Sequence, residues 1–346
     1  MKKTTLLIAA ALVAAACTDE PATPDTPAAG GKRHALVLCE GSWGGNDASL
    51  ARLATDDGTA EVEWFEASNG RGLGDVAQDM VLCGGKAYVT VTFSNSLEAV
   101  DTASGSSVRH AMGNLHPRYI TVDGSRLYIS CYEGHQVVAY DTADLDTPAA
   151  TYTLGDYQPE GVAVAGGKLF VASSWIQQQN QQYDYDSVVY VFDLASGTLA
   201  GTVTVGLNPQ NVLAMDDNHV AVNYNGDYGG HPAGCAIIEV SGMSVEQMGR
   251  AATGMAVADG VLYAFDRQGY GSTSTATYWR YDGNTTTTIP IAINTPYSIS
   301  VAADGTIYVT TDGNYTAAGD VCCHSADGTL RWRTEAGMLP KKVIVL

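Results

Sequence analysis

The sequence is poor in basic residues, in long apolar runs and in phenylalanine, and each shortage excludes a class of protein. Its 346 residues include 18 Lys and Arg against 37 Asp and Glu, which gives a formal net charge of −19. A field of that sign repels phosphate backbones, so we expect no nucleic-acid partner. The continuous apolar run lies within the first seventeen residues and is too short to span a bilayer. With 38 Gly and 19 Tyr but only 5 Phe, the composition favours turns and strands over helices.

Sequence motifs of catalysis are also missing. The chain contains no G-x-S-x-G elbow, no H-E-x-x-H, no phosphate-binding loop and no EF-hand. Two scattered sets of residues stay open as alternatives. One is a histidine group for metal or acid–base chemistry, His116, His135 and His231. The other is a set of three carboxylates from which a catalytic pair could form, Asp75, Glu160 and Asp227. Because histidines in turns are more often solvated, and no spacing brings the carboxylates together, we predict that the protein is not an enzyme. We also predict no catalytic residues, no metal site and no cofactor.

Six further cysteines follow Cys17, and none forms a C-x-x-C pair or has the histidine spacing of a zinc site. Cys39, Cys83 and Cys131 close predicted strands of similar register, where a thiol behaves as a small hydrophobic side chain. We interpret the six as structural. An oxidising compartment would allow disulfides, and the sequence leaves their pairing open.

The amino terminus has the pattern of an export signal. Residues 1–3 carry two lysines, and residues 6–16 form an apolar segment that ends in small residues. The segment Ala-Ala-Ala-Cys at residues 14–17 resembles the lipobox of bacterial lipoproteins, although Ala14 stands where Leu or Val is usual. We therefore predict a signal peptide over residues 1–16. The alternative is an ordinary secretory signal with an incidental cysteine.

The lipobox resemblance implies that Cys17 becomes the acylated first residue of the mature protein. Residues 17–32 are rich in Pro, Ala and Thr without apolar periodicity, which predicts a flexible tether. The acidic pair Asp19 and Glu20 is similar to the surface-export signal of some Gram-negative lipoproteins. Together these features imply an outer-membrane protein that faces the cell exterior and touches the membrane only through its lipid anchor.

A repeat dominates the sequence after residue 31. Each copy consists of a leading residue that is often Pro, a short apolar strand, a Gly-containing turn and a second strand shaped like Leu-Tyr-Val. A third strand, an Asp-led turn and a Thr-rich strand follow. The anchors of the second strands lie 40, 42, 51, 42 and 45 residues apart, at Tyr88, Tyr128, Phe170, Ala221, Tyr263 and Tyr308. That period is typical of a four-stranded propeller blade.

The two chain ends supply the parts of one further blade. Residues 34–39 resemble a second strand, residues 48–54 a third and residues 341–346 a first strand, and joining them removes exposed sheet edges. We predict an all-β fold, a seven-bladed β-propeller of four-stranded antiparallel blades over residues 33–346. Its ring is closed by pairing the C-terminal strand with the N-terminal strands. The recurring aspartates after the third strands are interpreted as turn caps: Asp101, Asp141, Asp193 and Asp282.

One face of the predicted ring gathers unusual loops. Successive connections of an antiparallel meander alternate between faces, so the loops between second and third strands share a face with the loops that lead into the next blade. Nearly all of these loops carry an aromatic residue beside amides, a combination that suits a large amphipathic ligand. The alternative is that polar loops and frequent Tyr are ordinary in such a chain. The predicted ligand-binding residues are Trp43, Asn46, Gln78, Arg118, Tyr132, His135, Trp175, Gln210, Tyr224, Asn225, Tyr228, Tyr297, Tyr315 and Lys341.

Two segments carry a family resemblance. LCEGSWG at residues 38–44 and NGRGLGDVAQ at residues 69–78, together with the Tyr-rich blades, resemble the YncE-like seven-bladed propeller lipoproteins. Within that group the chain is most similar to the BtuG-type surface lipoproteins. The resemblance implies capture of vitamin B12 outside the cell and its delivery to a TonB-dependent outer-membrane transporter. It supplies no short ligand motif, so the site residues rest on the loop argument alone.

A cobamide fits the predicted face chemically, because its apolar corrin plane is fringed by carboxamides and its nucleotide tail carries a phosphate. The roles expected are apolar packing for Trp43, Tyr132, Trp175 and Tyr228, amide pairing for Gln78, Gln210, Asn225 and residues 177–182, and phosphate contact for Arg118 or Lys341. Two other functions stay open. One is a propeller enzyme, either a lactonase or a quinoprotein dehydrogenase, and the other is a protein- or glycan-binding module.

Overall fold

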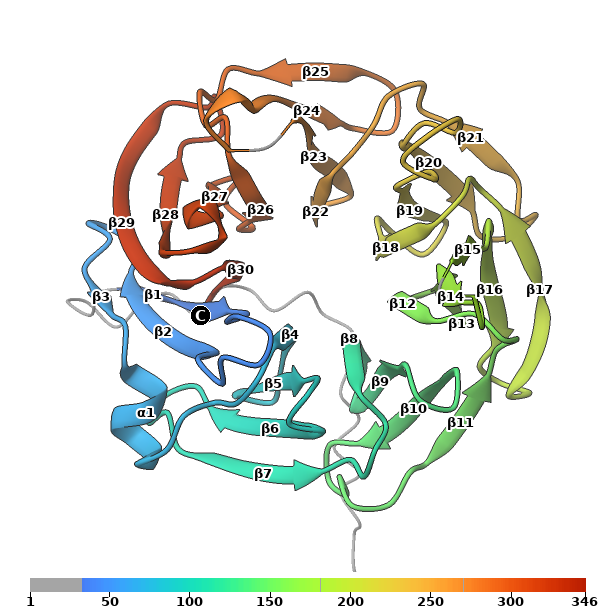
Figure 1. The fold of residues 1–346 in the computed structure, drawn as a ribbon, viewed down its shortest axis with the longest axis horizontal. Coiled ribbons are helices and arrows are strands. Elements are labelled where there is room, and N and C mark those ends of the chain that lie inside the picture. The colour runs from blue at the N-terminus through green and yellow to red at the C-terminus, as the bar shows by residue number, and fades with distance from the viewer. Residues whose placement is uncertain (1–32, 181, 270) are drawn as a thin grey trace, which may run out of the picture. The chain divides into compact units, whose positions relative to one another are not determined.

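Seven antiparallel sheets of four strands form a ring in the computed structural model, which describes residues 33–180, 182–269 and 271–346 (Figure 1). The ring lies within the compact unit Lys32–Leu346. The predicted all-β, seven-bladed propeller is therefore confirmed. The predicted signal peptide, Cys17 and the tether up to residue 32 lie outside the described residues. Over the described part of the chain, no helix is long and apolar enough to cross a membrane.

Blade 1 joins the two ends of the ring. From the centre outward it consists of β30 (Pro340–Val345), β1 (His34–Cys39), β2 (Ser49–Ala54) and β3 (Ala60–Glu61). The register places Ala35 opposite Val345 and Val37 opposite Val343. The predicted closure of the ring by its C-terminal strand is confirmed.

The other blades follow in chain order, and each runs from an inner to an outer strand (Figure 1). Blade 2 contains β4 (Ala77–Cys83), β5 (Lys86–Val91), β6 (Ser96–Asp101) and β7 (Ser107–Ala111). Blade 3 contains β8 (Pro117–Asp123), β9 (Arg126–Cys131), β10 (Gln136–Asp141) and β11 (Ala150–Thr153). Blade 4 contains β12 (Pro159–Ala165), β13 (Lys168–Ser173), β16 (Val188–Asp193) and β17 (Thr198–Thr204).

Blade 5 contains β18 (Pro209–Ala214), β19 (His219–Tyr224), β20 (Gly234–Glu239) and β21 (Val245–Gln247). Blade 6 contains β22 (Gly254–Ala258), β23 (Val261–Gln268), β24 (Thr275–Tyr281) and β25 (Thr286–Ile289). Blade 7 contains β26 (Pro296–Val301), β27 (Ile307–Thr311), β28 (Ala318–His324) and β29 (Leu330–Met338). Blade 4 also carries a separate hairpin of β14 (Trp175–Gln177) and β15 (Tyr183–Tyr185) between its second and third strands.

An apolar cluster fills each interface between neighbouring blades in the described part of the chain. The second-strand anchors explain the period of the sequence, because each points into the interface with the following blade. Tyr88 lies in the cluster between blades 2 and 3, and Phe170 in the cluster between blades 4 and 5. Among the described residues, these interface clusters and the strands that close the ring all lie between residues 33 and 346.

A short helix, α1 (Trp64–Asn69), interrupts the strands between blades 1 and 2, and the sequence pattern did not indicate it. It buries Trp64 and Phe65, and it ends at Gly70, whose positive φ of 63° lets its N–H bond to the carbonyl of Glu66. The side-chain amide of Asn69 donates to the Gly105 carbonyl of blade 2 at 2.8 Å. Tertiary contacts therefore hold a helix that is too short to be stable alone. Two short 3-10 segments, Gly271–Thr273 and Gly313–Tyr315, lie in loops of blades 6 and 7.

The aspartates at the ends of the third strands accept hydrogen bonds from backbone N–H groups two or three residues later in the chain, as predicted. Asp101 accepts from the amide of Ser104 and Asp193 from that of Ser196, both at 2.8 Å. Asp141 and Asp282 make the equivalent bonds. These four side chains are turn caps.

All six cysteines between residues 33 and 346 are thiols, and five of them are buried. Burial raises the pKa of Cys131 and Cys235 to about 12, so neither ionises near neutral pH. We expect Ellman's reagent at pH 8 to modify at most the half-buried Cys83 in the folded unit, and all six thiols after unfolding in guanidinium chloride. Rapid labelling of two or more thiols in the folded unit would contradict the described packing.

Candidate functional site: an aromatic face

The loops between second and third strands lie beside the loops that lead into the blades, as predicted. Backbone hydrogen bonds join the two kinds of loop, from Thr92 to Val76 in blade 2 at 2.8 Å and from Ser174 to Gln158 in blade 4 at 2.9 Å. The aromatic side chains of these loops therefore share one side of the ring. We call this surface the aromatic face, and it comprises Trp43, Phe93, Tyr132, Trp175, Tyr183, Tyr185, Tyr228 and Tyr315, together with Tyr297 at the start of the inner strand of blade 7, which contacts Tyr315.

Ring contacts join neighbouring blades at several places on the aromatic face. Trp43 lies 6.1 Å from Phe93, and Phe93 lies 5.7 Å from His116, which joins blades 1, 2 and 3. Trp43 is 82% exposed and Tyr228 is 72% exposed. Large rings exposed together on one surface are typical of a binding site, since each offers rigid apolar area to a partner.

The hairpin β14–β15 extends this arrangement across blade 4. Trp175, Tyr183 and Tyr185 occupy the same side of the two-stranded sheet, because Trp175 pairs with Tyr185 and Tyr183 lies two residues away. Trp175 meets Tyr132 of blade 3 edge-on at 6.0 Å and Tyr183 at 5.3 Å, while Tyr185 meets Tyr228 of blade 5 at 6.3 Å. Phe93, Tyr183 and Tyr185 were not among the predicted site residues. The alternation of Tyr183 and Tyr185 is the signal that could have identified the last two.

Polar side chains near the inner ends of the blades form two hydrogen-bonded groups beside the aromatic face, one around Glu160 and one around Glu40. We call Glu40, Gln78, Arg118, Tyr132, Glu160, Tyr297 and Lys341 the axial network. Arg118 donates to Glu160 Oε2 through Nη2 at 2.9 Å and to Gln78 Oε1 at 2.6 Å. The Tyr132 hydroxyl donates to Glu160 Oε1. Burial and the neighbouring Glu160 raise the pKa of Tyr132, so its hydroxyl stays a donor.

On blades 1 and 7 the axial network repeats this construction around Glu40. Lys341 Nζ donates to Glu40 Oε2 at 2.9 Å, and the Tyr297 hydroxyl donates to the same oxygen. Burial opposes ionisation of Glu40, but the charge of Lys341 and the bond from Tyr297 outweigh it and hold the pKa of this carboxyl below its ordinary value. Arg118 and Lys341 each have a carboxylate partner, so the network is balanced in charge.

The other predicted site residues lie in several environments. Asn46 is exposed in the blade 1 loop, and His135 bonds to the Tyr157 carbonyl at 3.1 Å. Asn225 donates to the Tyr228 hydroxyl at 3.3 Å, on the aromatic face. Gln210 donates to the side chain of Asn208 at 2.6 Å. The Tyr224 hydroxyl donates to Gln247 on the outer strand of blade 5, which directs this ring away from the axis.

The alternative histidine and carboxylate groups are not assembled. His116 faces Glu133 of another loop of blade 3 at 3.7 Å, and His231 faces Asp227 of its own loop at 2.7 Å. Asp75 accepts from the Gly44 amide at 3.0 Å. Among the residues described, no group of three or more His, Cys, Asp or Glu side chains is placed to hold a metal ion.

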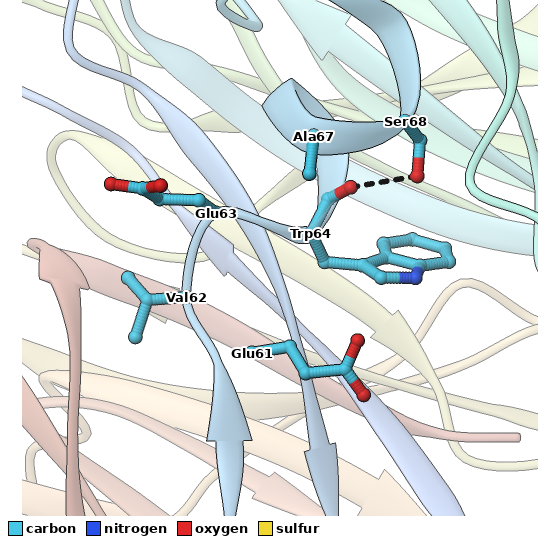
Figure 2. A pocket seen from close by; sticks show the side chains of 6 residues that line it. All are labelled: Glu61, Val62, Glu63, Trp64, Ala67 and Ser68. Atoms are coloured by element: carbon cyan, nitrogen blue, oxygen red, sulfur yellow. Dashed lines mark hydrogen bonds between the residues drawn. The ribbon is translucent and has the colours of Figure 1, made fainter.

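A separate hollow lies at the outer rim of the ring beside α1. Figure 2 shows its lining, which consists of Glu61, Val62, Glu63, Trp64, Ala67 and Ser68. The Ser68 hydroxyl donates to the Trp64 carbonyl at 2.8 Å, a hydrogen bond within α1. None of the predicted site residues lines this hollow.

Comparison with known proteins supports the fold. No protein-family model matches the chain, and no curated protein matches it in sequence. A candidate 6-phosphogluconolactonase of Bacteroides fragilis has a TM-score of 0.64 and 14% identity, covering 94% of this chain and 100% of that one. A quinonprotein alcohol dehydrogenase-like protein of Bacteroides thetaiotaomicron has a TM-score of 0.62 and 14% identity. The match covers 90% of this chain and 78% of that one. Kuenenia stuttgartiensis hydrazine synthase has a TM-score of 0.61 and 14% identity. The match covers 78% of this chain and 95% of that one. At such identity the likeness establishes the propeller fold alone.

Proposed function

We propose that this protein is a non-catalytic surface lipoprotein that binds vitamin B12 or a related cobamide on the aromatic face. Anchored through Cys17 in the outer membrane and facing the cell exterior, it passes the ligand to a TonB-dependent transporter. The observation that carries the proposal is the grouping of contacting rings on the loops of blades 1 to 5, in which Trp43 and Tyr228 are exposed and Trp175 is half-buried. A wide, rigid and largely apolar platform suits the corrin plane of a cobamide.

Amide groups beside the rings supply the polar part of the proposed site. Asn225 stands next to Tyr228, and the hairpin exposes Gln177 and Gln178 beside Tyr183. Each primary amide both donates and accepts, which matches the carboxamides at the edge of a corrin. The ligand carries many neutral polar groups and one phosphate, so amides serve it better than a strongly charged surface would.

The axial network supports binding rather than catalysis. Arg118 and Lys341 are neutralised by Glu160 and Glu40, so neither offers a free cation to the ligand phosphate. Each carboxylate of the network is likewise held by a cation and a tyrosine hydroxyl, which leaves no base poised for proton transfer. We therefore assign most of the binding energy to the aromatic rings.

Calorimetric titration of residues 33–346 with cyanocobalamin tests the proposal directly. We expect saturable heat, and a pink protein after desalting. An absence of heat at micromolar concentrations would remove the proposal. Lactone hydrolysis by the same sample would favour the enzyme alternative, and retrieval of a transporter without any vitamin would favour a purely protein-binding role.

Replacing Trp175 by Ala is expected to lower the affinity for cyanocobalamin at least tenfold, which corresponds to about 1.4 kcal/mol. The same result is expected for Trp43→Ala, because both changes remove a ring from the platform without emptying the core. Leu330→Ala is the control, since Leu330 is 51% exposed on the outer strand of blade 7. Equal affinities of all three variants and the parent, measured by calorimetry, would contradict a role for the aromatic face.

A further inference from the structure

Two glutamates, one buried and one half-buried, lie behind the aromatic face, and each has the same kinds of partner. Glu160 lies at the start of β12 with its side chain 2% exposed, and Glu40 follows β1 with its side chain 14% exposed. Each binds one cation and one tyrosine hydroxyl. The two tyrosines belong to both the axial network and the aromatic face.

At Glu160, successive contacts connect the buried carboxylate through the Tyr132 ring to Trp175. Arg118 binds one carboxylate oxygen through both Nε and Nη2, at 3.3 and 2.9 Å, and Tyr132 binds the other oxygen. The guanidinium carbon lies 4.5 Å from the centre of the Tyr132 ring, within the range of a cation–π contact. The Tyr132 ring therefore has two fixed contacts below it, and its upper contact is the edge-on pair with Trp175 at 6.0 Å.

At Glu40 the same order is repeated with different residues. Lys341 supplies the cation, Tyr297 donates its hydroxyl, and the Tyr297 ring meets Tyr315 edge-on at 6.1 Å and an angle of 84°. Tyr315 is 49% exposed and lies in the second-to-third-strand loop of blade 7. One carboxylate therefore stands behind a ring of the aromatic face at each of two places, behind the half-buried Trp175 and behind the exposed Tyr315.

We propose that Glu160 and Glu40 are positioning residues, which fix Tyr132 and Tyr297 and through them hold Trp175 and Tyr315 in the geometry that receives the ligand. A hydrogen bond to a charged acceptor is stronger and more directional than one to a neutral acceptor. A pre-oriented ring loses less conformational freedom when the ligand binds. The assignment to ligand binding rests on the proposed function, whereas the orientation of the rings does not.

The test uses Tyr132→Phe, which keeps the ring and removes only the bond to Glu160. We expect the affinity for cyanocobalamin to fall about tenfold. Tyr281→Phe is the matched control, because the Tyr281 hydroxyl donates at 2.9 Å to the Gly283 carbonyl in the turn between the third and outer strands of blade 6. In a Trp175→Ala background, Tyr132→Phe is expected to have no further effect, since the ring that it positions is absent. An equal fall in both backgrounds would overturn the positioning role.

A second readout needs no ligand. The chain contains five tryptophans, so protein labelled with 5-fluorotryptophan gives five fluorine resonances, and Trp175→Phe assigns one of them. We expect Tyr132→Phe and Glu160→Gln to shift the Trp175 resonance and to leave those of Trp279 and Trp332 unchanged. An unchanged Trp175 resonance in Tyr132→Phe would overturn the proposal. If the parent protein does not bind cyanocobalamin, the proposed function fails, and the fluorine spectrum still decides whether the glutamates position the rings.

Discussion

Deleting residues 340–346 is expected to abolish cooperative folding of the ring. The deletion removes β30, the inner strand of blade 1, and leaves the β1 backbone from Ala35 to Leu38 paired with β2 alone. It also removes Val343, which is buried in the cluster between blades 7 and 1, and Ile344, which packs against the cluster between blades 1 and 2. Two core interfaces would open at once. Because domains are stable by only about 5–15 kcal/mol, we expect no sharp thermal transition in the truncated protein.

A point substitution tests closure without shortening the chain. Val343→Asp places an unpaired carboxylate in the cluster beside Val37, and we expect it to cost about 3 kcal/mol or more of the free energy of unfolding. Leu346→Asp is the matched control, because Leu346 is 42% exposed just beyond the same strand, and its expected cost is below about 0.5 kcal/mol. Calorimetry of both variants checks the ranking. Similar melting temperatures for the two would show that β30 is not needed to close the ring.

The blade repeat could be predicted from the sequence because one residue of each second strand packs into the interface with the next blade. Tyr128 and Tyr263 each fill the wedge between their blade and the next one, so the spacing of the anchors reports the size of a blade. The shared blade was also predictable, since residues 34–39 and 341–346 each lacked a partner strand. Helix α1 was not, because six residues carry no helical period and the helix depends on contacts with blade 2.

The candidate site was predictable in its residue types and only partly in its contacts. The meander rule placed Trp43, Tyr132 and Trp175 on one face, and the structure brings Tyr132 and Trp175 together. It did not reveal that Tyr297 would bind Glu40, because those residues are 257 positions apart and meet only when the ring closes. The same holds for Arg118 and Glu160, which lie on neighbouring blades. Partners across blades follow from the angle between sheets, which no local pattern encodes.

Glu98→Gln is expected to destabilise blade 2 strongly. Glu98 is fully buried on β6, where Arg71 binds both of its carboxylate oxygens at 2.9 and 2.7 Å and Arg109 Nε donates at 2.5 Å. Ser107 adds a fourth bond at 2.6 Å. These contacts tie the segment between α1 and β4 to the blade, since Arg109 also donates to the Leu73 carbonyl at 2.8 Å.

The size of the loss follows from the exposure of the two arginines. Removing one partner of a fully buried ion pair typically costs 3–5 kcal/mol. Arg71 and Arg109 are 32% and 41% exposed, so water compensates part of the lost charge, and we expect about 2–3 kcal/mol for Glu98→Gln at pH 7. Urea unfolding measures it. Glu63→Gln is the control, because Glu63 is exposed beside α1 and its side chain makes no cap bond to that helix.

The pH dependence of the stability lost in Glu98→Gln shows whether the loss comes from the missing carboxylate charge or from altered packing. Burial opposes ionisation of Glu98, but the bonds from Arg71, Ser107 and Arg109 outweigh it and hold the pKa of this carboxyl below its ordinary value. A carboxyl with a lowered folded-state pKa contributes its full stabilisation above the unfolded-state pKa of about 4.3, and loses it as the pH falls through the folded-state value. The difference between the parent and Glu98→Gln should therefore be constant from pH 7 to 5 and shrink below about pH 4. A difference that stays constant into acid would mean that the variant perturbs packing rather than removing a charge.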